Sequence, residues 1–208
     1  MYSKIAKIDY YLPGQVLSNS DLEKVFPDWS AEKIEAKVGI KERHIAAGNE
    51  TALDMAEQAA IKVLAGIDRQ KIDFLMLCTQ SPDYFLPTSA CILQDRLGLS
   101  KSCGALDFNL GCSGFIYGLA LAKGLISSLV AKRVLLITSE TYSKHMSCDD
   151  KGNRSIFGDG AAATLVTASG RNEIRTFVLG TDGSGYETLI VEGGAMRATA
   201  LQETEEKE

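Results

Sequence analysis

The 208-residue sequence contains few of the side chains that bind metals or cross-link a fold. It has two histidines, and its five cysteines are an odd number without a CxxC pair. A zinc or di-iron site needs a cluster of such ligands at characteristic spacing, so we expect no metal. We also expect the thiols to be reduced, because nothing in the cysteine pattern indicates a disulfide framework.

The sequence also lacks the signals of nucleic-acid binding, export and membrane insertion. Its net charge is −5 and it has no basic runs, which argues against nucleic acid or an anionic membrane as the main partner. The first residues lack the apolar core of a signal peptide, which favours a cytoplasmic location. Residues 115–130 are strongly apolar but fall short of the roughly 20 residues that span a bilayer. We therefore expect a fully buried helix there.

What the sequence does contain is an alternation of strand and helix patterns. Strands are expected over residues 5–12, 74–79, 105–110, 134–138, 161–166 and 175–179, and helices over 31–37, 51–64, 90–97 and 115–130. Thr51 and Asp54 resemble a capping box, and Pro87 suits a first helical residue. The connections are long enough for parallel pairing, so the pattern predicts an α/β fold with a covered sheet in one compact unit.

The most distinctive stretch is the corner Gly111-Cys112-Ser113-Gly114, which joins an apolar strand to the apolar helix. Glycines let the backbone and a substrate approach closely. The start of a helix presents unpaired N–H groups and the positive end of the macrodipole, which stabilise a thiolate. Cys112 is therefore a candidate nucleophile. The competing interpretation is a buried structural cysteine.

Four stretches, taken together, carry a family resemblance. They are Gly39-Ile40-Lys41-Glu42-Arg43, Thr79-Gln80-Ser81-Pro82-Asp83 with Pro87, Gly111-Cys112-Ser113-Gly114-Phe115 and Phe157-Gly158-Asp159-Gly160-Ala161. In this order and spacing they resemble the β-ketoacyl-acyl carrier protein synthase III family of the thiolase superfamily. The resemblance implies a thiolase-like layered fold, αβαβα in complete members, with residues 1–200 as the N-terminal half. The C-terminal half would be absent, and residues 201–208 would be a solvated acidic tail.

The resemblance implies a condensing acyltransferase of fatty acid or related biosynthesis. Cys112 would take an acyl group from a primer thioester, carried by coenzyme A or a carrier protein. It would pass this group to a decarboxylated malonyl group on acyl carrier protein. The family members are homodimers, and the resemblance implies no cofactor beyond these substrates.

Other positions acquire roles only through the resemblance. Leu86, Phe157 and Leu189 would line the acyl pocket, with Leu86 reaching into the site of a second subunit; ordinary core packing is the alternative for each. Lys37 and Lys151 would lie near the coenzyme A or carrier binding site. The family's adenine-stacking tryptophan is replaced by Lys33, and Trp29 lies earlier in the chain, so a primer on a carrier protein is a real option beside coenzyme A.

Two alternatives remain beside the condensing enzyme. The histidine and asparagine that complete the family's site lie in its second half, and neither His44 nor His145 is expected to replace them. The chain would then be a non-catalytic half-subunit that needs a complementary chain. A hydroxymethylglutaryl-coenzyme A synthase is disfavoured, because no glutamate follows Thr79 before Ala90.

Overall fold

The computed structural model describes residues 1–193 and 195–196 of the chain. The chain divides into two compact units, Met1–Phe177 and Val178–Glu208. In the second unit the described residues include a 3₁₀ helix, η3 (Gly183–Thr188). The predicted extent of a single unit to residue 200 stays a prediction, and the expected acidic tail at 201–208 lies outside the described residues.

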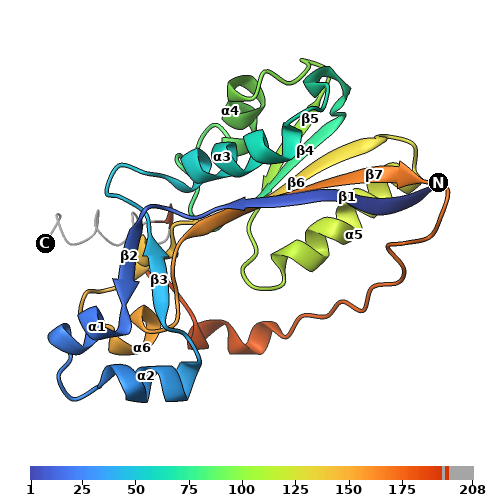
Figure 1. Cartoon of the computed structure of the whole chain (residues 1–208). Coiled ribbons are helices and arrows are strands. Elements are labelled where there is room, and N and C mark those ends of the chain that lie inside the picture. Colours follow the sequence, from blue (N-terminus) through green and yellow to red (C-terminus); the bar gives the residue numbers. More distant parts are fainter. Residues whose placement is uncertain (194, 197–208) are drawn as a thin grey trace, which may run out of the picture. The chain divides into compact units, whose positions relative to one another are not determined.

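A five-stranded mixed sheet forms the centre of the first unit (Figure 1). In spatial order the strands are β1 (Tyr2–Tyr11), β7 (Gly160–Ser169), β6 (Arg133–Glu140), β4 (Phe74–Cys78) and β5 (Gly104–Phe108). The strands β6, β4 and β5 are parallel, as the crossover lengths predicted. The strands β1 and β7 are antiparallel to their neighbours, so the α/β class is confirmed but the pairing is mixed.

Helices cover both faces of this sheet (Figure 1). On one face α3 (Ala52–Leu64) and α4 (Ser89–Arg96) pack on strand residues such as Leu75 and Leu77. On the other face α5 (Gly114–Ser127) packs on the sheet through Leu119, Ala122 and Ile126. These apolar side chains are almost completely buried, which supplies the main driving force for this layering.

The expectation of a fully buried helix over residues 115–130 is wrong. Helix α5 buries only the stripe that faces the sheet, whereas Ile116 and Leu121 are 45% and 49% exposed. A helix that is apolar all round needs a neighbour on each side to be buried completely. In this unit only one sheet packs against α5.

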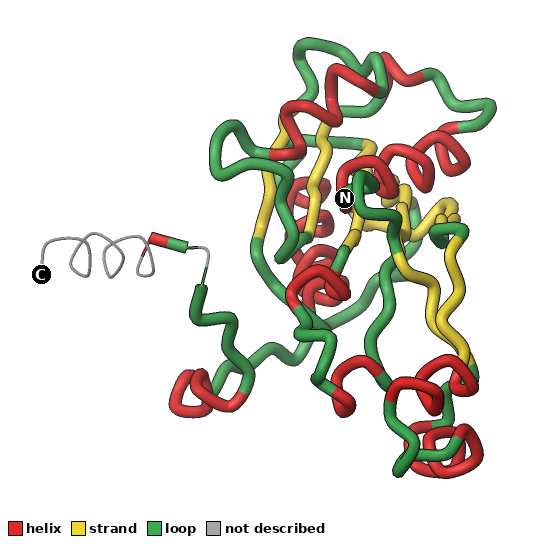
Figure 2. The backbone as a smooth tube through the Cα atoms, turned by 90° about the vertical axis from the view of Figure 1, so that its left-hand side faces the viewer, coloured by secondary structure: helices red, strands yellow, loops and turns green. Residues whose placement is uncertain are grey.

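A smaller layer is built from residues that lie far apart in the sequence. The antiparallel pair β2 (Gln15–Ser18) and β3 (Glu42–Ile45) leads from the sheet toward α1 (Asn19–Val25), α2 (Ala31–Val38) and α6 (Lys151–Arg154), as Figures 1 and 2 show. The expected helix over residues 31–37 is confirmed, with Ser30 as its N-cap and Gly39 in the left-handed conformation at its end. The short strands β2 and β3 were not predicted, because their polar sequences show no clear alternation.

Local sequence signals predicted several helix ends correctly, but one helix start and one strand were predicted wrongly. The Thr51–Asp54 capping box begins α3, with both reciprocal hydrogen bonds present. Pro87 is not the first residue of α4, because Thr88 is the N-cap and the helix begins at Ser89. No strand forms over residues 175–179, which have no sheet neighbour among the described residues.

Candidate active site

The carboxyl ends of the three parallel strands meet at one edge of the sheet. Cys78 of β4 lies opposite both Phe108 of β5 and Thr138 of β6. The segments that follow these strands therefore leave the sheet side by side. They carry Gln80 and Ser81, the Cys112 corner, and the 3₁₀ helix η2 (Tyr142–His145), which follows Glu140 at the end of β6.

The Cys112 corner is a tight turn that leads directly into α5. The Gly114 N–H donates to the Gly111 carbonyl oxygen at 2.8 Å, which closes the turn. Ser113 is the N-cap residue of the helix, but its side chain makes no capping hydrogen bond. Cys112 is exposed, so the alternative of a buried structural cysteine is wrong for this position. Its role as nucleophile stays a prediction.

The structural cysteine of this region is Cys78, which lies beneath the corner. Its thiol donates to the Leu110 carbonyl oxygen at 3.1 Å, and burial raises its pKa to about 11. A Cβ atom added to Gly114 would lie 2.3 Å from the Cys78 Sγ atom. The glycine at the start of α5 is therefore required by close packing and not only by the turn.

Glu140, the last residue of β6, connects this strand to the segment after β4. Its carboxylate accepts hydrogen bonds from the Gln80 N–H at 2.7 Å and from the Ser81 hydroxyl at 2.8 Å. Burial raises the pKa of Glu140, while these hydrogen bonds and the nearby His145 act in the opposite direction. His145 Nε2 lies 3.4 Å from the Ser81 hydroxyl oxygen. The second histidine, His44, contacts the Pro13 carbonyl oxygen instead.

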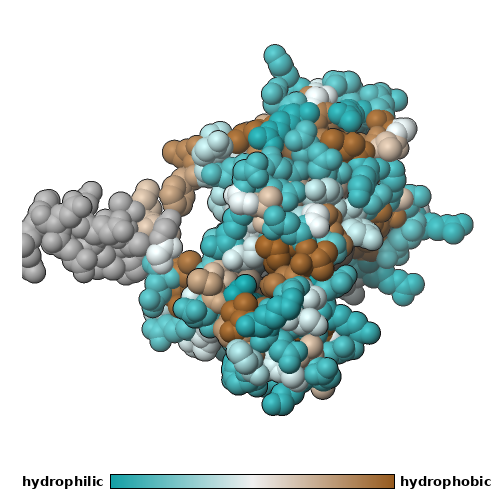
Figure 3. Space-filling view, turned by 60° about the vertical axis from the view of Figure 1, so that its left-hand side comes forward, coloured by the Kyte–Doolittle hydropathy of each residue, from teal (hydrophilic) through white to brown (hydrophobic). Residues whose placement is uncertain are grey.

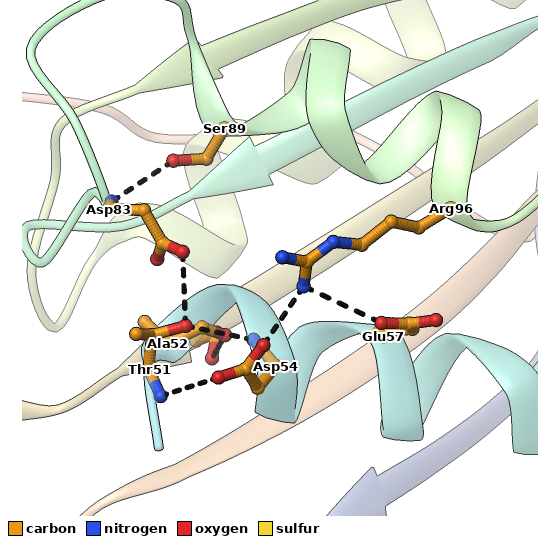
Figure 4. Close-up of polar contacts among 8 residues, drawn as sticks. Thr51, Ala52, Asp54, Glu57, Asp83, Ser89 and Arg96 are labelled. Atoms are coloured by element: carbon orange, nitrogen blue, oxygen red, sulfur yellow. Dashed lines mark hydrogen bonds and ion pairs between the residues drawn. The ribbon is translucent and has the colours of Figure 1, made fainter. Parts of the chain in front are cut away.

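The segment between β4 and α4 projects apolar side chains but is tethered near both ends. Tyr84, Phe85 and Leu86 are 61%, 76% and 86% exposed. At its start Asp83 accepts a hydrogen bond from the Thr51 hydroxyl at 3.1 Å and donates its own N–H to the Ser89 hydroxyl (Figure 4). The predicted acyl-pocket residue Leu86 therefore lies in the projecting part of an anchored segment.

An acidic and basic cluster holds α3 against α4 beside this segment. Arg96 forms ion pairs with Asp54 at 2.9 Å and with Glu57 at 3.6 Å (Figure 4). Burial acts to raise the pKa of Asp54, but hydrogen bonds from Thr51 and Arg96 outweigh it and lower the pKa. The helices that support the segment are thus joined by charge as well as by apolar packing.

Lys37 and Lys151 lie together around the only tryptophan. Their Nζ atoms lie 5.2 Å and 4.9 Å from the centroid of the Trp29 ring, distances suited to cation–π contact. Lys151 also pairs with Asp28 at 2.7 Å. These residues, with Lys33 and Ala36, line an open pocket of about 530 Å³. The structure brings the two predicted carrier-binding lysines into one pocket, which we name the Trp29 pocket.

The other two predicted acyl-pocket residues lie in different units. Phe157 is half-buried, stacks on Tyr142 with ring centroids 4.6 Å apart, and lines a cavity of about 420 Å³ with Met146 and Ile45. Leu189 follows η3 in the second unit and is 65% exposed. Their acyl-binding roles stay predictions.

Within residues 1–193 and 195–196, no group of three or more histidine, cysteine, aspartate or glutamate side chains could hold a metal ion. Among the helices described, none has both the length and the apolar character needed to cross a bilayer.

Comparison with known proteins agrees with the geometry at this edge. A sequence profile described as 3-oxoacyl-[acyl-carrier-protein (ACP)] synthase III matches residues 106–183, which include the corner. The chain is 40% identical over 191 residues to a β-ketoacyl-[acyl-carrier-protein] synthase III of Xanthomonas euvesicatoria, which covers 91% of this chain and 58% of that protein. The corresponding protein 1 of Vibrio vulnificus is 44% identical over 195 residues, covering 92% and 61%.

Solved structures give the same result for the fold. A crystal structure of a 3-oxoacyl-(acyl-carrier-protein) synthase III has a TM-score of 0.92 and 53% identity, covering 95% of this chain and 60% of the other. The chain belongs to the β-ketoacyl-acyl carrier protein synthase III family. The Pseudomonas aeruginosa synthase III has a TM-score of 0.85 and 32% identity, with 94% and 62% covered. The chain thus spans about three fifths of the length of these relatives of the synthase III family.

Sequence reasoning missed two features of this candidate synthase III site. A glutamate near Thr79 was considered only between Thr79 and Ala90. Glu140, at the end of β6, nevertheless contacts this segment, because its carboxylate accepts the Gln80 N–H. Because carboxyl ends of parallel strands share an edge, the end of the predicted strand 134–138 could have indicated this neighbour. Sequence reasoning also treated Trp29 as displaced from the carrier site, whereas the fold brings its ring into contact with both lysines.

Proposed function

We propose that this chain supplies the acyl-accepting cysteine of a condensing enzyme of fatty acid or related biosynthesis. The observation that carries the proposal is the exposed Cys112 thiol at the start of the 14-residue helix α5. The unpaired N–H groups and the dipole of such a helix stabilise a thiolate. Membership of the synthase III family supports the same assignment.

The proposed reaction has two acyl transfers. In the first, the Cys112 sulfur attacks the thioester carbonyl of the primer, the bond to the carrier sulfur breaks, and the carrier thiolate takes up a proton. In the second, a malonyl group on acyl carrier protein loses carbon dioxide. Its carbanion forms a carbon–carbon bond to the acyl carbonyl, and the Cys112 sulfur leaves as thiolate. A whole synthase also needs polar groups that stabilise this carbanion.

The test of the first transfer is direct acylation. We expect a thioester-linked acyl group on the peptide that contains Cys112 after incubation with an acyl donor, detected by mass spectrometry. The Cys112→Ser variant should give no such adduct, whereas Cys91→Ser, which removes another exposed cysteine, should acylate normally. Absence of an adduct from both acyl-coenzyme A and acyl-acyl carrier protein would contradict the proposal.

The Trp29 pocket is proposed as the site for the phosphate-bearing part of the primer carrier. Three lysines line it, and a lysine ammonium binds phosphate oxygens as a point charge. The Nζ atoms of Lys37 and Lys151 both lie over the Trp29 ring, so ammonium groups compete with an adenine for stacking on it. This favours a carrier-protein primer over coenzyme A.

Comparing donors tests this preference. Acyl-acyl carrier protein should acylate Cys112 at lower concentration than acyl-coenzyme A, and Lys37→Ala with Lys151→Ala should weaken that transfer. Lys101→Ala, a charge removed elsewhere, is the control. Saturable acylation by micromolar acetyl-coenzyme A would overturn the preference.

We further propose that the segment carrying Leu86 contacts a second copy of the chain in a homodimer. Three consecutive exposed apolar residues, Tyr84, Phe85 and Leu86, support this, because a projecting apolar tip is costly unless it is covered. Leu86→Asp should shift the oligomeric state toward monomer in light scattering after gel filtration. An unchanged mass distribution would contradict the dimer contact.

A further inference from the structure

Glu140 ends β6, Gln80 follows the neighbouring parallel strand β4, and the two meet at the edge that carries Cys112. We propose that Glu140 is a positioning residue for the Cys112 corner and that it acts through Gln80. The inference rests on the proposed role of Cys112 as acyl acceptor. It adds residues from two further strands to a site that the sequence motif confines to one corner.

The first link is a pair of hydrogen bonds that holds the segment after β4. One oxygen of the Glu140 carboxylate accepts the Gln80 N–H at 2.7 Å, and the other accepts the Ser81 hydroxyl at 2.8 Å. Two hydrogen bonds to one planar carboxylate fix both the position and the direction of residues 80–81. The backbone of Gln80 is therefore held by the end of β6.

The second link is the Gln80 side chain, which lies against the corner itself. Its Nε2 donates to the Asn109 side-chain oxygen at 3.1 Å. Its Oε1 is so close to Gly111 that a Cβ atom added there would lie 3.0 Å away. Asn109 and Gly111 flank Leu110, and Cys112 comes next in the chain. A shift of Gln80 therefore changes the support of the residues that immediately precede the thiol.

Both oxygens of the Glu140 carboxylate are used as acceptors, one by the Gln80 N–H and one by the Ser81 hydroxyl. A glutamine at position 140 has the same shape but only one oxygen and no charge. The Gln80 N–H and the Ser81 hydroxyl therefore cannot both donate to it, and the bond that remains loses its charge assistance. The charged neighbours of Glu140 are His145 of η2, which favours its ionised form, and Asp159 ahead of β7, which opposes it.

The experiment measures alkylation of the intact chain by iodoacetamide, site by site, as a function of pH. The variants are Glu140→Gln and Gln80→Met, the second of which keeps the side-chain length and leaves Glu140 unchanged. The matched control is Asp73→Asn, because Asp73 also accepts two backbone N–H groups, from Lys132 and Arg133, at the opposite end of β6. The exposed Cys91 and Cys148 serve as internal references in every sample.

We expect both test variants to alkylate Cys112 about two- to fivefold more slowly at neutral pH, because only the thiolate reacts and a displaced corner lowers its share. The pH midpoint of Cys112 alkylation should rise, because a displaced corner loses stabilisation of the thiolate by the start of α5. The reference cysteines and Asp73→Asn should behave as in the parent chain. The double variant should be no slower than the slower single variant, because both changes break one chain of contacts.

Three results would overturn the inference. The first is an unchanged Cys112 rate in Gln80→Met. The second is a lower pH midpoint in Glu140→Gln, which is the effect of removing a nearby negative charge alone. The third is additive slowing in the double variant. If Glu140→Gln does not fold, as judged by circular dichroism, Gln80→Met decides the question. If alkylation responds as expected but no acyl adduct forms, only the proposed function fails.

Discussion

At the scale of single residues, Gly114 is placed where no side chain fits. We expect Gly114→Ala to lower the free energy of unfolding by about 1–3 kcal/mol, because its Cβ would overlap the buried Cys78 Sγ atom. Gly124→Ala is the matched control in the same helix, since an added Cβ there meets nothing within 4 Å. It should raise stability by up to about 1 kcal/mol. Urea denaturation measures both.

A second variant identifies the cause of this effect. In the Cys78→Ala background the atom that Gly114→Ala would strike is gone, so the cost of the substitution should fall by more than half. An equal cost in both backgrounds would show that the backbone conformation, and not the contact with Cys78, requires the glycine.

The cysteines should also differ in their response to pH. Burial raises the pKa of Cys78 and of Cys103 from 9.0 to about 11. At pH 8 we expect iodoacetamide to label Cys112 and leave both buried thiols unmodified. The folded pKa lies above the unfolded value, so this contribution to stability is complete below pH 9 and is lost as the pH rises through about 11.

Denaturation at several pH values checks the sign of this effect. The free energy of unfolding should fall between pH 9 and pH 11, and the fall should be smaller in Cys103→Ala, which lacks one of the two titrating thiols. Labelling of Cys78 as fast as Cys112 in the folded chain at pH 8 would contradict the buried environment.

At the scale of elements, the N-terminus of α4 is capped by a side chain of a neighbouring strand and not by its own N-cap residue. Thr88 makes no side-chain capping bond, and Asp107 of β5 accepts the N–H groups of Ser89 and Ala90 at 2.6 and 2.7 Å. Burial raises the pKa of Asp107, and these two hydrogen bonds act against that rise. The start of α4, and with it the end of the Leu86 segment, therefore depends on the strand that leads to Cys112.

Removal of this cap should be costly. We expect Asp107→Ala to lower the free energy of unfolding by about 1–2 kcal/mol, the range seen for lost N-caps. Asp95→Ala removes an exposed carboxylate from α4 itself and should change stability by no more than about 0.5 kcal/mol. Thermal denaturation of the two variants side by side makes the comparison, and equal effects would rule out the capping role.

At the scale of the whole molecule, the apolar outer face of α5 should promote self-association. Besides Ile116 and Leu121, the residues after the helix include Leu129 and Val130, which are 71% and 64% exposed. The view in Figure 3 likewise shows separate apolar patches within a hydrophilic surface. This exposure also favours the alternative in which the chain acts as a half-subunit that binds a complementary chain.

Sedimentation velocity tests the role of this face. Leu121→Lys should reduce self-association. Ile61→Lys should not, because Ile61 lies on α3, which covers the other face of the sheet; its side chain is 39% exposed. Equal behaviour of the two variants would assign any association to another surface, such as the Leu86 segment. The half-subunit alternative further predicts that Cys112 labels no faster than Cys91 and Cys148, which are also exposed.

The elements whose signals are local could be read from the sequence. The capping box at Thr51 and Asp54, the N-cap at Ser30 and the buried apolar strand that became β4 depend on neighbours within a few residues. The four motifs indicated the family because their residues, order and spacing can all be read from the sequence without the fold. The antiparallel placement of β1 and β7 was not predictable in this way, because nothing local distinguishes their partners.

The sequence by itself determined the α/β class, most helix ends, the family and the choice of Cys112 as the candidate nucleophile. Only the tertiary structure decided that Cys112 is exposed while Cys78 is buried beneath it, that Glu140 holds the segment that supports the corner, and that Trp29 contacts both Lys37 and Lys151. The physical reason is separation along the chain. Hydrophobic periodicity and capping act over one or two turns. The contacts of Cys78 with Leu110 and of Gln80 with Glu140 join residues 32 and 60 positions apart, and only the packing of strands and helices brings such residues together.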